Sequence, residues 1–319
     1  MEKHFNMNQL RLYTSLFTSL NNPKGLPYWV LTPLRRPIRE IANKMLPDYL
    51  SKPVPYSQDV AQNVIVSLTS FPGRIGVVWQ VIETLKRQSL RPKMILLWLS
   101  KKQFPNEEDV PSKLRSLQDE VFMIRMVDED IRSHKKYFYA MQEFPDKTII
   151  TFDDDIYYHP DMVKRLVQTS KKYNRCIIAN VTNQLQYDGE RLKPYKEWGR
   201  CFTKYSSLNR VQIGVGGVLY PPNALHKMVF RQDLFTELAP LADDLWLNSM
   251  ARLVKTPVVQ NDFHYLWMEI HTGASTLTSV NNGSENMNDK QLGQIRNYLD
   301  KEGMPDVYAF DYKVVSDID

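Results

Sequence analysis

Strand-type and helix-type patterns of apolar residues alternate along the middle of the chain. The strand-type runs are short, continuous and rich in Val, Ile and Leu, and they lie at residues 63–69, 93–100, 121–128, 147–152 and 175–181. The helix-type segments place apolar residues three and four positions apart, and they lie at residues 77–88, 111–120, 133–144, 159–173 and 238–253. Apolar strands separated by helices predict an α/β fold, with a mixed, mostly parallel sheet flanked by helices.

Polar segments follow three of these predicted strands directly. They are SFPGR (70–74), DEDIRSHKK (128–136) and the three aspartates 153–155. In largely parallel sheets, ligands bind beyond the carboxyl ends of the strands. The three segments are therefore expected to line one crevice, and this crevice is the predicted functional site.

The two ends of the chain differ from this alternating region. Residues 23–55 hold seven of the nineteen prolines, which predicts a linker-like stretch with short helical pieces and a boundary near residue 60. Residues 288–303 predict a surface helix that closes over the crevice or mediates self-association. The predicted organisation is an N-terminal helical, proline-rich extension (1–60), a main domain (61–280) and a C-terminal helix and tail (281–319).

The net charge of the chain is concentrated in its N-terminal extension. Residues 1–52 carry eight Lys/Arg and three Asp/Glu, a net charge of +5, whereas the rest of the chain has 33 residues of each sign. Nucleic acid is not an expected partner, because that function would favour basic residues across the main domain. A basic, aromatic and Leu-rich segment favours peripheral contact of residues 1–50 with an anionic membrane, or with a partner protein. A solvated cap packed on the main domain is the alternative.

Export and membrane insertion are not predicted. No apolar run approaches the ~20 residues that span a bilayer, and the first twenty residues lack the apolar core and cleavage site of a signal peptide. The two cysteines, Cys176 and Cys201, lack metal-ligand spacing and are expected to be thiols. A cytoplasmic protein is predicted, with peripheral association at the inner face of the cell membrane.

Three consecutive carboxylates, Asp153, Asp154 and Asp155, stand at the end of a predicted buried strand. Oxygen ligands of this kind suit a hard divalent cation. On a strand-like backbone residues i and i+2 point the same way, so Asp153 and Asp155 are expected to face one ion while Asp154 turns aside. A solvated turn that caps the next helix is the alternative.

Basic residues stand at the neighbouring strand ends. Arg74, Lys135 and Lys136 could contact phosphate oxygens, although lysines on an exposed helix face are commonly only solvated. Carboxylates, a metal ion and nearby bases together suit a nucleotide diphosphate. The chain lacks the G-x-x-x-x-G-K-[ST] pattern, so phosphate binding by a P-loop is not predicted.

The glycines of GVGGVLYPP (214–222) raise the question of a dinucleotide site. The third glycine of G-x-G-x-x-G is replaced by Leu219, and Tyr-Pro-Pro follows where a helix should begin. A dinucleotide-binding fold is therefore not predicted here. Gly216 and Gly217 are instead expected to let the backbone pass close to a ligand, with a simple turn as the alternative.

Two further segments carry candidate chemistry. Asp243 and Asp244 lie early in a predicted helix, where acids are common because of the helix dipole, yet one of them could take a proton from a hydroxyl nucleophile. His271 stands beside small residues in MEIHTGAS, and a lone histidine is more often structural than a ligand. Tyr195 and Trp198, in KPYKEWGR, could stack on an acceptor sugar or pack in the core.

Five motifs together resemble a known family. VIVSLTSFPGRI, KMILLWLS, IITFDDDIYYHP, GVGGVLYPP and LADDLWLNSM occur in the order seen in bacterial GT-A-type glycosyltransferases. They are most similar to the family 2-like enzymes of capsule, lipopolysaccharide or wall-glycan assembly. The match covers roughly residues 62–275 and leaves both ends of the chain outside it.

The resemblance implies a role for each motif residue. Asp153 and Asp155 would be the D-x-D pair that binds Mn²⁺ or Mg²⁺ and touches the nucleotide, with His271 completing the metal site. Asp244 matches the second acid of a Glu-Asp pair that supplies the catalytic base, and Asp243 stands where the family has Glu, which leaves the base open between them. The other implied donor contacts are Thr69, Pro72, Arg74, Lys136, Asp154, Gly216 and Gly217.

The implied activity is transfer of a sugar, with inversion, from a nucleotide-diphosphate donor such as a UDP-sugar. The acceptor would be a hydroxyl group of a glycan or lipid-linked molecule. Two alternatives stay open: a metal-dependent nucleotidyltransferase or phosphohydrolase, which would also use clustered carboxylates, and a non-catalytic protein that binds carbohydrate or nucleotide on the same fold.

Overall fold

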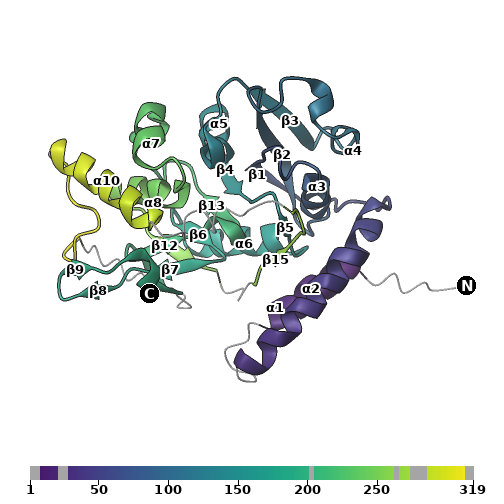
Figure 1. Ribbon diagram of the computed structural model, residues 1–319, viewed down its shortest axis with the longest axis horizontal. Helices are drawn as coiled ribbons and strands as arrows, with labels where there is room; N and C mark the ends of the chain where they lie inside the picture. Colours follow the sequence, from purple (N-terminus) through teal and green to yellow (C-terminus); the bar gives the residue numbers. More distant parts are fainter. Residues whose placement is uncertain (1–7, 21–27, 201–204, 262–265, 274–285, 313–319) are drawn as a thin grey trace, which may run out of the picture.

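A large mixed sheet forms the centre of the computed structural model, which describes residues 8–20, 28–200, 205–261, 266–273 and 286–312. Its strands are β1 (Val60–Thr69), β2 (Arg91–Ser100), β3 (Phe122–Val127), β4 (Thr148–Thr151), β6 (Ile177–Ala179), β11 (Ser206–Ser207), β13 (Val218–Tyr220) and β14 (Val258–Gln260). The strand order is β11-β14-β6-β13-β4-β1-β2-β3, and all strands except β11 and β13 run parallel (Figure 1). The predicted mixed, mostly parallel α/β fold is confirmed.

Helices cover both faces of this sheet because its central strands are apolar on both sides. Val64, Val66 and Leu68 of β1 pack in one cluster with α3 (Val78–Lys86) and α6 (Met162–Lys172). Ile65, one residue out of phase, packs in another cluster with Ala140 of α5 (Lys135–Glu143). This alternation follows from the period of two along a strand.

The remaining elements lie outside this sheet. The other helices are α1 (Gln9–Ser19), α2 (Tyr28–Ser51), α4 (Ser112–Arg115), α7 (Gln232–Leu238), α8 (Asp243–Leu253) and α10 (Met287–Lys301). The other strands are β5 (Ile156–Tyr157), β7 (Thr182–Gln184), β8 (Tyr187–Asp188), β9 (Arg191–Leu192), β10 (Gly199–Arg200), β12 (Arg210–Gln212) and β15 (Met268–Glu269). They form a three-stranded sheet (β10-β7-β12) and two small pairs, β15-β5 and β8-β9.

Two main clusters of buried side chains lie side by side in the molecule. The first joins β1, β2, α3 and α6 to the N-terminal helices, and the second joins α7, α8 and α10 to β12 and β13. Within β13, Leu219 belongs to the first cluster, whereas Val218 and Tyr220 belong to the second. The seam between the clusters therefore runs along β13, next to β4.

The proline-rich N-terminal segment forms one long helix, so the prediction of a linker with short helical pieces is wrong. Helix α2 spans 24 residues and contains Pro33, Pro37 and Pro47. Each proline removes one backbone hydrogen bond, but burial of Ala42, Leu46 and Leu50 holds the helix against the main body. Tertiary packing outweighs the local preference here.

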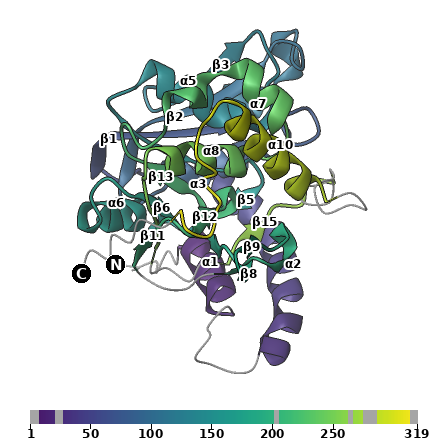
Figure 2. The ribbon, with the colours of Figure 1, turned by 90° about the vertical axis from the view of Figure 1, so that its left-hand side faces the viewer.

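Helices α1 and α2 form a hairpin that docks on the sheet body by polar contacts as well as apolar ones. The Arg11 guanidinium donates to Asp161 at 2.8 Å, and the Arg39 guanidinium donates to Glu269 at 3.0 Å. The end of α1 and the start of α2 extend away from the sheet in both views (Figure 2). We call these two helices the α1–α2 hairpin.

The surface helix predicted for residues 288–303 is present as α10, which packs one face on the body and leaves the other exposed. Leu292, Ile295 and Leu299 are buried in the second cluster with α7 and α8.

The thiol of Cys176 is buried and free, whereas Cys201 lies outside the described residues. Among the helices the structure describes, none is long and apolar enough to cross a membrane.

Candidate functional site

A cavity of about 730 Å³ lies at the carboxyl ends of β1 and β4. This volume lies within the range of small-molecule sites. The first turns of α5 and α8 and the loop before β13 close its other sides. All three predicted strand-end segments contribute lining residues, which include Thr69, Arg74, Arg132, Lys136, Asp153, Asp154, Asp155, Gly214, Asp243 and Asp244.

Two basic side chains compensate the three consecutive aspartates. The Arg74 guanidinium donates to Asp154 at 2.8 Å and pairs with Asp155 at 3.0 Å, while Lys136 Nζ lies 3.2 Å from Asp153. The Ser70 hydroxyl also donates to Asp154. Burial raises the pKa of Asp155 to about 7, with the charge of Asp154 adding to the effect and Arg74 opposing it.

The side-chain directions predicted for the three aspartates are wrong. Asp153 and Asp155 do not face the same way, and Asp154 does not turn aside alone. The three residues form a bend between β4 and β5, so the strand period does not apply to them. Asp154 and Asp155 share Arg74, whereas Asp153 faces Lys136. All three still line the cavity.

The aspartates suit a metal ion only together with a ligand. Within the described ranges, no group of three or more His, Cys, Asp or Glu side chains is arranged to hold an ion by itself. Mg²⁺ is commonly bound by one or two carboxylates together with substrate phosphates. Asp153 and Asp155 pair with different bases here, so each would contribute one carboxylate, and phosphate oxygens would complete the coordination.

His271, the third predicted metal ligand, lies elsewhere. It lines a second hollow beside α2, where its Nε2 is 3.5 Å from Glu40 and its backbone N–H donates to Asn43 at 2.9 Å. Its side chain is half exposed and points to the α1–α2 hairpin rather than to the aspartates. The structure therefore does not bring His271 to the cavity.

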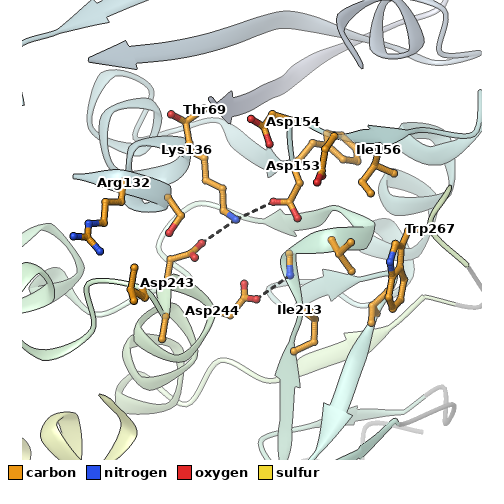
Figure 3. A pocket seen from close by; sticks show the side chains of 18 of the residues that line it. Thr69, Arg132, Lys136, Asp153, Asp154, Ile156, Ile213, Asp243, Asp244 and Trp267 are labelled. Carbon is orange, nitrogen blue, oxygen red and sulfur yellow. Dashed lines mark hydrogen bonds and ion pairs between the residues drawn. The ribbon is translucent and has the colours of Figure 1, made fainter. Parts of the chain in front are cut away.

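Lys136 is the centre of the charged network (Figure 3). Its Nζ lies 2.9 Å from Asp243 and 3.2 Å from Asp153, and the side chain is only 8% exposed. Burial alone lowers the pKa of a lysine, but the charges of Asp153, Asp243 and Asp244 raise the pKa of Lys136 well above its ordinary value. Lys136 is thus a permanent cation buried at the bottom of the cavity.

Asp243 and Asp244 are neighbours in sequence but differ in environment. Burial alone would raise the pKa of Asp243, but the adjacent Lys136 cation outweighs this and lowers it, so Asp243 stays ionised. Burial and the charge of Asp243 raise the pKa of Asp244 to about 7. Asp244 accepts a hydrogen bond from the backbone N–H of Gly214 at 3.1 Å and lines the cavity.

A buried histidine that the sequence did not single out joins the two helices that carry this network. His134 accepts from the Tyr137 hydroxyl at Nδ1 (2.9 Å), and its Nε2–H donates to the Ala239 carbonyl at 2.8 Å. Burial lowers the pKa of His134 to about 4, so the ring is neutral. It ties the start of α5, with Lys136, to the segment that precedes α8. Its sequence signal was only its position beside the two lysines.

The glycine that faces the cavity is Gly214 rather than the predicted pair. A Cβ atom at Gly214 would lie 3.0 Å from Lys136 Nζ and 3.3 Å from Asp244. Gly216 and Gly217 lie behind it, and Gly217 has φ +84°, where a side chain would overlap the ring of Phe152. The Gly-rich loop therefore brings backbone close to the charged network at Gly214, and Gly217 shapes the turn.

The other predicted contacts divide between the cavity and its surroundings. Thr69 and Tyr195 line the cavity. Pro72 is exposed on the turn after β1, where Phe71 contributes to the lining instead. Trp198 is 4% exposed and its indole N–H donates to the Lys193 carbonyl at 2.8 Å, so it packs in the core.

Sequence reasoning missed two cavity residues on opposite sides of the Lys136 network, Arg132 and Trp267 (Figure 3). Arg132 is exposed, has φ +54° and forms no ion pair with another described residue. Trp267 lies under the Arg200 guanidinium, 4.4 Å from the ring centroid. In the sequence, Arg132 is only one more basic residue of the segment DEDIRSHKK, and no pattern around Trp267 indicates a site.

Comparison with known proteins gives weak likenesses. No family model and no curated sequence matches the chain. Among solved structures, a 4-diphosphocytidyl-2C-methyl-D-erythritol synthase is similar at TM-score 0.39 and 11% identity, covering 65% of this chain and 92% of that one. An apo UDP-glucose pyrophosphorylase gives 0.37 and 9% (76% and 99% covered), and a UTP-bound UGPase from Acinetobacter baumannii gives 0.35 and 8% (72% and 98% covered).

None of these three structures is titled a glycosyltransferase, so the family resemblance of the motifs gains no support from them. At TM-scores below 0.5 and identities near 10%, the likenesses assign neither a family nor an activity to this chain.

Proposed function

We propose that this protein transfers a sugar from a nucleoside-diphosphate donor to a hydroxyl group of a glycan or lipid-linked acceptor, with inversion. The observation that carries the proposal is Asp244, a cavity carboxylate whose pKa is raised to about 7 beside the buried cation Lys136. A base with this pKa is half ionised near neutral pH, which is the condition for efficient proton removal from a hydroxyl group.

The basic side chains of the cavity suit the diphosphate of the donor. Lys136 lies at the bottom of the cavity and Arg132 at its edge, so the phosphates would lie near the first turn of α5. Asp153 and Asp155 would hold Mg²⁺ or Mn²⁺ together with the phosphate oxygens. The ion, when bound, neutralises the charge that develops on the departing diphosphate.

The remaining steps belong to residues of the chain. Asp244 takes the proton of the acceptor hydroxyl, which attacks the anomeric carbon from the face opposite the diphosphate. Asp243 keeps Lys136 in place and, by its charge, keeps the pKa of Asp244 high. Tyr195 and Trp267 offer aromatic surface to the acceptor sugar at the same cavity.

The same base argues against nucleotidyl transfer as the main activity. In the nucleotidyltransferase reaction that forms a nucleotide-sugar, a phosphate oxygen of the sugar phosphate attacks the nucleoside triphosphate, and this oxygen is already largely ionised near pH 7 because the second phosphate pKa is about 6. That reaction has no proton for Asp244 to remove. A hydroxyl acceptor does need a base, and the raised pKa of Asp244 in the cavity supports that role.

The test is to compare the two reactions in one set of assays. The full chain is incubated with UDP-, GDP- and CDP-sugars plus Mg²⁺ or Mn²⁺, and release of nucleoside diphosphate is measured with and without glycan acceptors. In parallel it is incubated with nucleoside triphosphates and sugar 1-phosphates, and pyrophosphate is measured. Diphosphate release is expected. Pyrophosphate release alone would establish the nucleotidyltransferase alternative, and nucleotide binding without either product would establish the non-catalytic one.

Metal binding is expected to require the nucleotide. Because the chain alone does not present a complete ligand set, Mg²⁺ or Mn²⁺ added by itself should leave the melting temperature unchanged, whereas metal and UDP together should raise it. Isothermal titration of UDP with and without metal provides the affinity. Asp155→Asn should remove the effect of the metal, while Asp161→Asn, which pairs with Arg11 outside the cavity lining, should retain it. A melting shift by metal alone would contradict this arrangement.

A further inference from the structure

We propose that the α1–α2 hairpin is a docking surface for an anionic lipid membrane. Half of the large hydrophobic side chains exposed in the described residues belong to its two helices. They are Leu12 and Leu16 on α1 and Leu34, Ile41 and Met45 on α2, each 38–51% exposed. Exposed apolar residues gathered on one substructure mark a contact surface rather than chance.

The α2 residues share one face of the helix. Leu34, Ile41 and Met45 are spaced by seven and four positions, which aligns them along about three helical turns. The face that packs on the body is a different one, carried by Ala42, Leu46 and Leu50. Helix α2 is therefore apolar on two faces, only one of which the rest of the chain covers.

The positive charge of the hairpin favours an anionic membrane as its partner. The first 52 residues hold the whole net charge of +5, and the exposed residues Arg36 and Lys44 of α2 form no ion pair with another described residue. An apolar stripe with basic flanks matches a surface that offers both acyl chains and negative head groups. A protein partner would have to supply acids and an apolar groove together, and a second copy of this hairpin would bring basic residues against basic residues. No described helix can span the bilayer, so the contact is with the membrane surface.

The hairpin also contacts the wall of the cavity. The Arg39 guanidinium donates to Glu269, which lines the cavity, and Asn43 Nδ2 donates to the Glu269 carbonyl at 3.0 Å. Glu269 lies in β15, whose partner β5 follows the three aspartates directly. A membrane bound at the hairpin would therefore lie on the side of the molecule next to the catalytic cavity.

The experiment is cosedimentation of the full chain with vesicles of phosphatidylcholine alone and with vesicles of phosphatidylcholine mixed with phosphatidylglycerol, whose anionic head groups represent those of a cytoplasmic leaflet. Binding to the anionic vesicles only is expected, and it should fall as salt rises. Leu34→Ser/Ile41→Ser/Met45→Ser should reduce the bound fraction at least about tenfold. Arg36→Glu/Lys44→Glu should do the same.

Matched controls separate this surface from general hydrophobicity and charge. Met126→Ser/Val254→Ser removes exposed apolar side chains elsewhere, and Lys93→Glu/Lys171→Glu makes the same change in net charge outside the hairpin. Both controls should bind like the wild type, and circular dichroism should show every variant folded. Failure of the wild type to bind anionic vesicles, or equal losses in variants and controls, would overturn the proposal. A dimer that the triple serine variant dissociates would assign the surface to self-association instead. The measurement is independent of the transfer reaction.

Discussion

Replacing Asp244 with asparagine is expected to lower the rate of sugar transfer about 10²–10⁴-fold, which is the usual contribution of a general base. Donor binding should be retained, because asparagine still offers an oxygen to the Gly214 N–H and leaves the Lys136 network in place. Transfer is measured as nucleoside diphosphate released at saturating acceptor, and donor binding by titration calorimetry. A variant that transfers at the wild-type rate would remove Asp244 from the mechanism.

The pH dependence distinguishes the two neighbouring acids. In the wild type kcat/KM should fall about tenfold per pH unit below pH 7, because Asp244 must be ionised to act. Asp243→Asn should move the midpoint to lower pH, since the charge of Asp243 is one cause of the raised pKa of Asp244. Asp244→Asn should remove the part of the dependence that belongs to the base, and any remaining part would belong to Asp155, whose pKa is also about 7. An unshifted midpoint in Asp243→Asn would show that the two carboxylates do not interact as described.

The stability of Asp244→Asn provides a control for folding. The folded-state pKa of Asp244 lies above its ordinary unfolded value near 4. Its favourable contribution is therefore complete below about pH 4 and lost as the pH rises through about 7. Asparagine stays neutral at every pH, so above pH 7 the variant should unfold at a higher denaturant concentration than the wild type. Reduced activity in a variant of equal or greater stability cannot be attributed to misfolding.

Replacing Lys136 with methionine is expected to destabilise the fold by about 3–5 kcal/mol, because it leaves the buried carboxylate of Asp243 without its cation. It should also weaken UDP binding about 10–100-fold, the value of a charge-assisted contact to phosphate. Chemical denaturation measures the first effect and calorimetry the second. The double variant Lys136→Met/Asp243→Asn should recover most of the stability but none of the binding.

Lys86 offers a matched comparison for Lys136. It is also buried and paired with an acid, but its partner Asp119 is 40% exposed, so water can solvate the carboxylate that remains. Lys86→Met should therefore cost clearly less stability than Lys136→Met, and it should leave UDP binding unchanged. Equal losses from the two substitutions would mean that the Lys136 network has no special role.

The sheet was predictable from the sequence because its signal is local. Continuous runs of Val, Ile and Leu between helix-type segments gave five strands, and these correspond to β1–β4 and β6. The meeting of three strand-end segments in one cavity followed from the parallel order. The long helix α2 was not predicted, because its prolines lower the local preference for helix. The burial of Leu46 and Leu50 that stabilises it comes from residues that are distant in the sequence.

The details of the site depended on side-chain directions that local patterns do not fix. The side-chain alternation expected for a strand was wrong at the three aspartates because they form a bend. The sequence also did not indicate that Asp243 and Asp244, which are adjacent in a helix, have different environments. The Gly-rich loop was recognised, but only its fold shows that Gly214 faces the cavity. His271 was expected there, and only its long-range contacts with Glu40 and Asn43 show that it lies beside α2.

The seam between the two clusters of buried side chains has a consequence for local unfolding. Phe152, from the first cluster, and Leu245, from the second, both line the cavity. Regions with separate cores can open independently, and their amide hydrogens then exchange with solvent at different free energies. A ligand that touches both walls would couple the two openings. In the bound protein, the halves should therefore protect their amides as one cooperative unit.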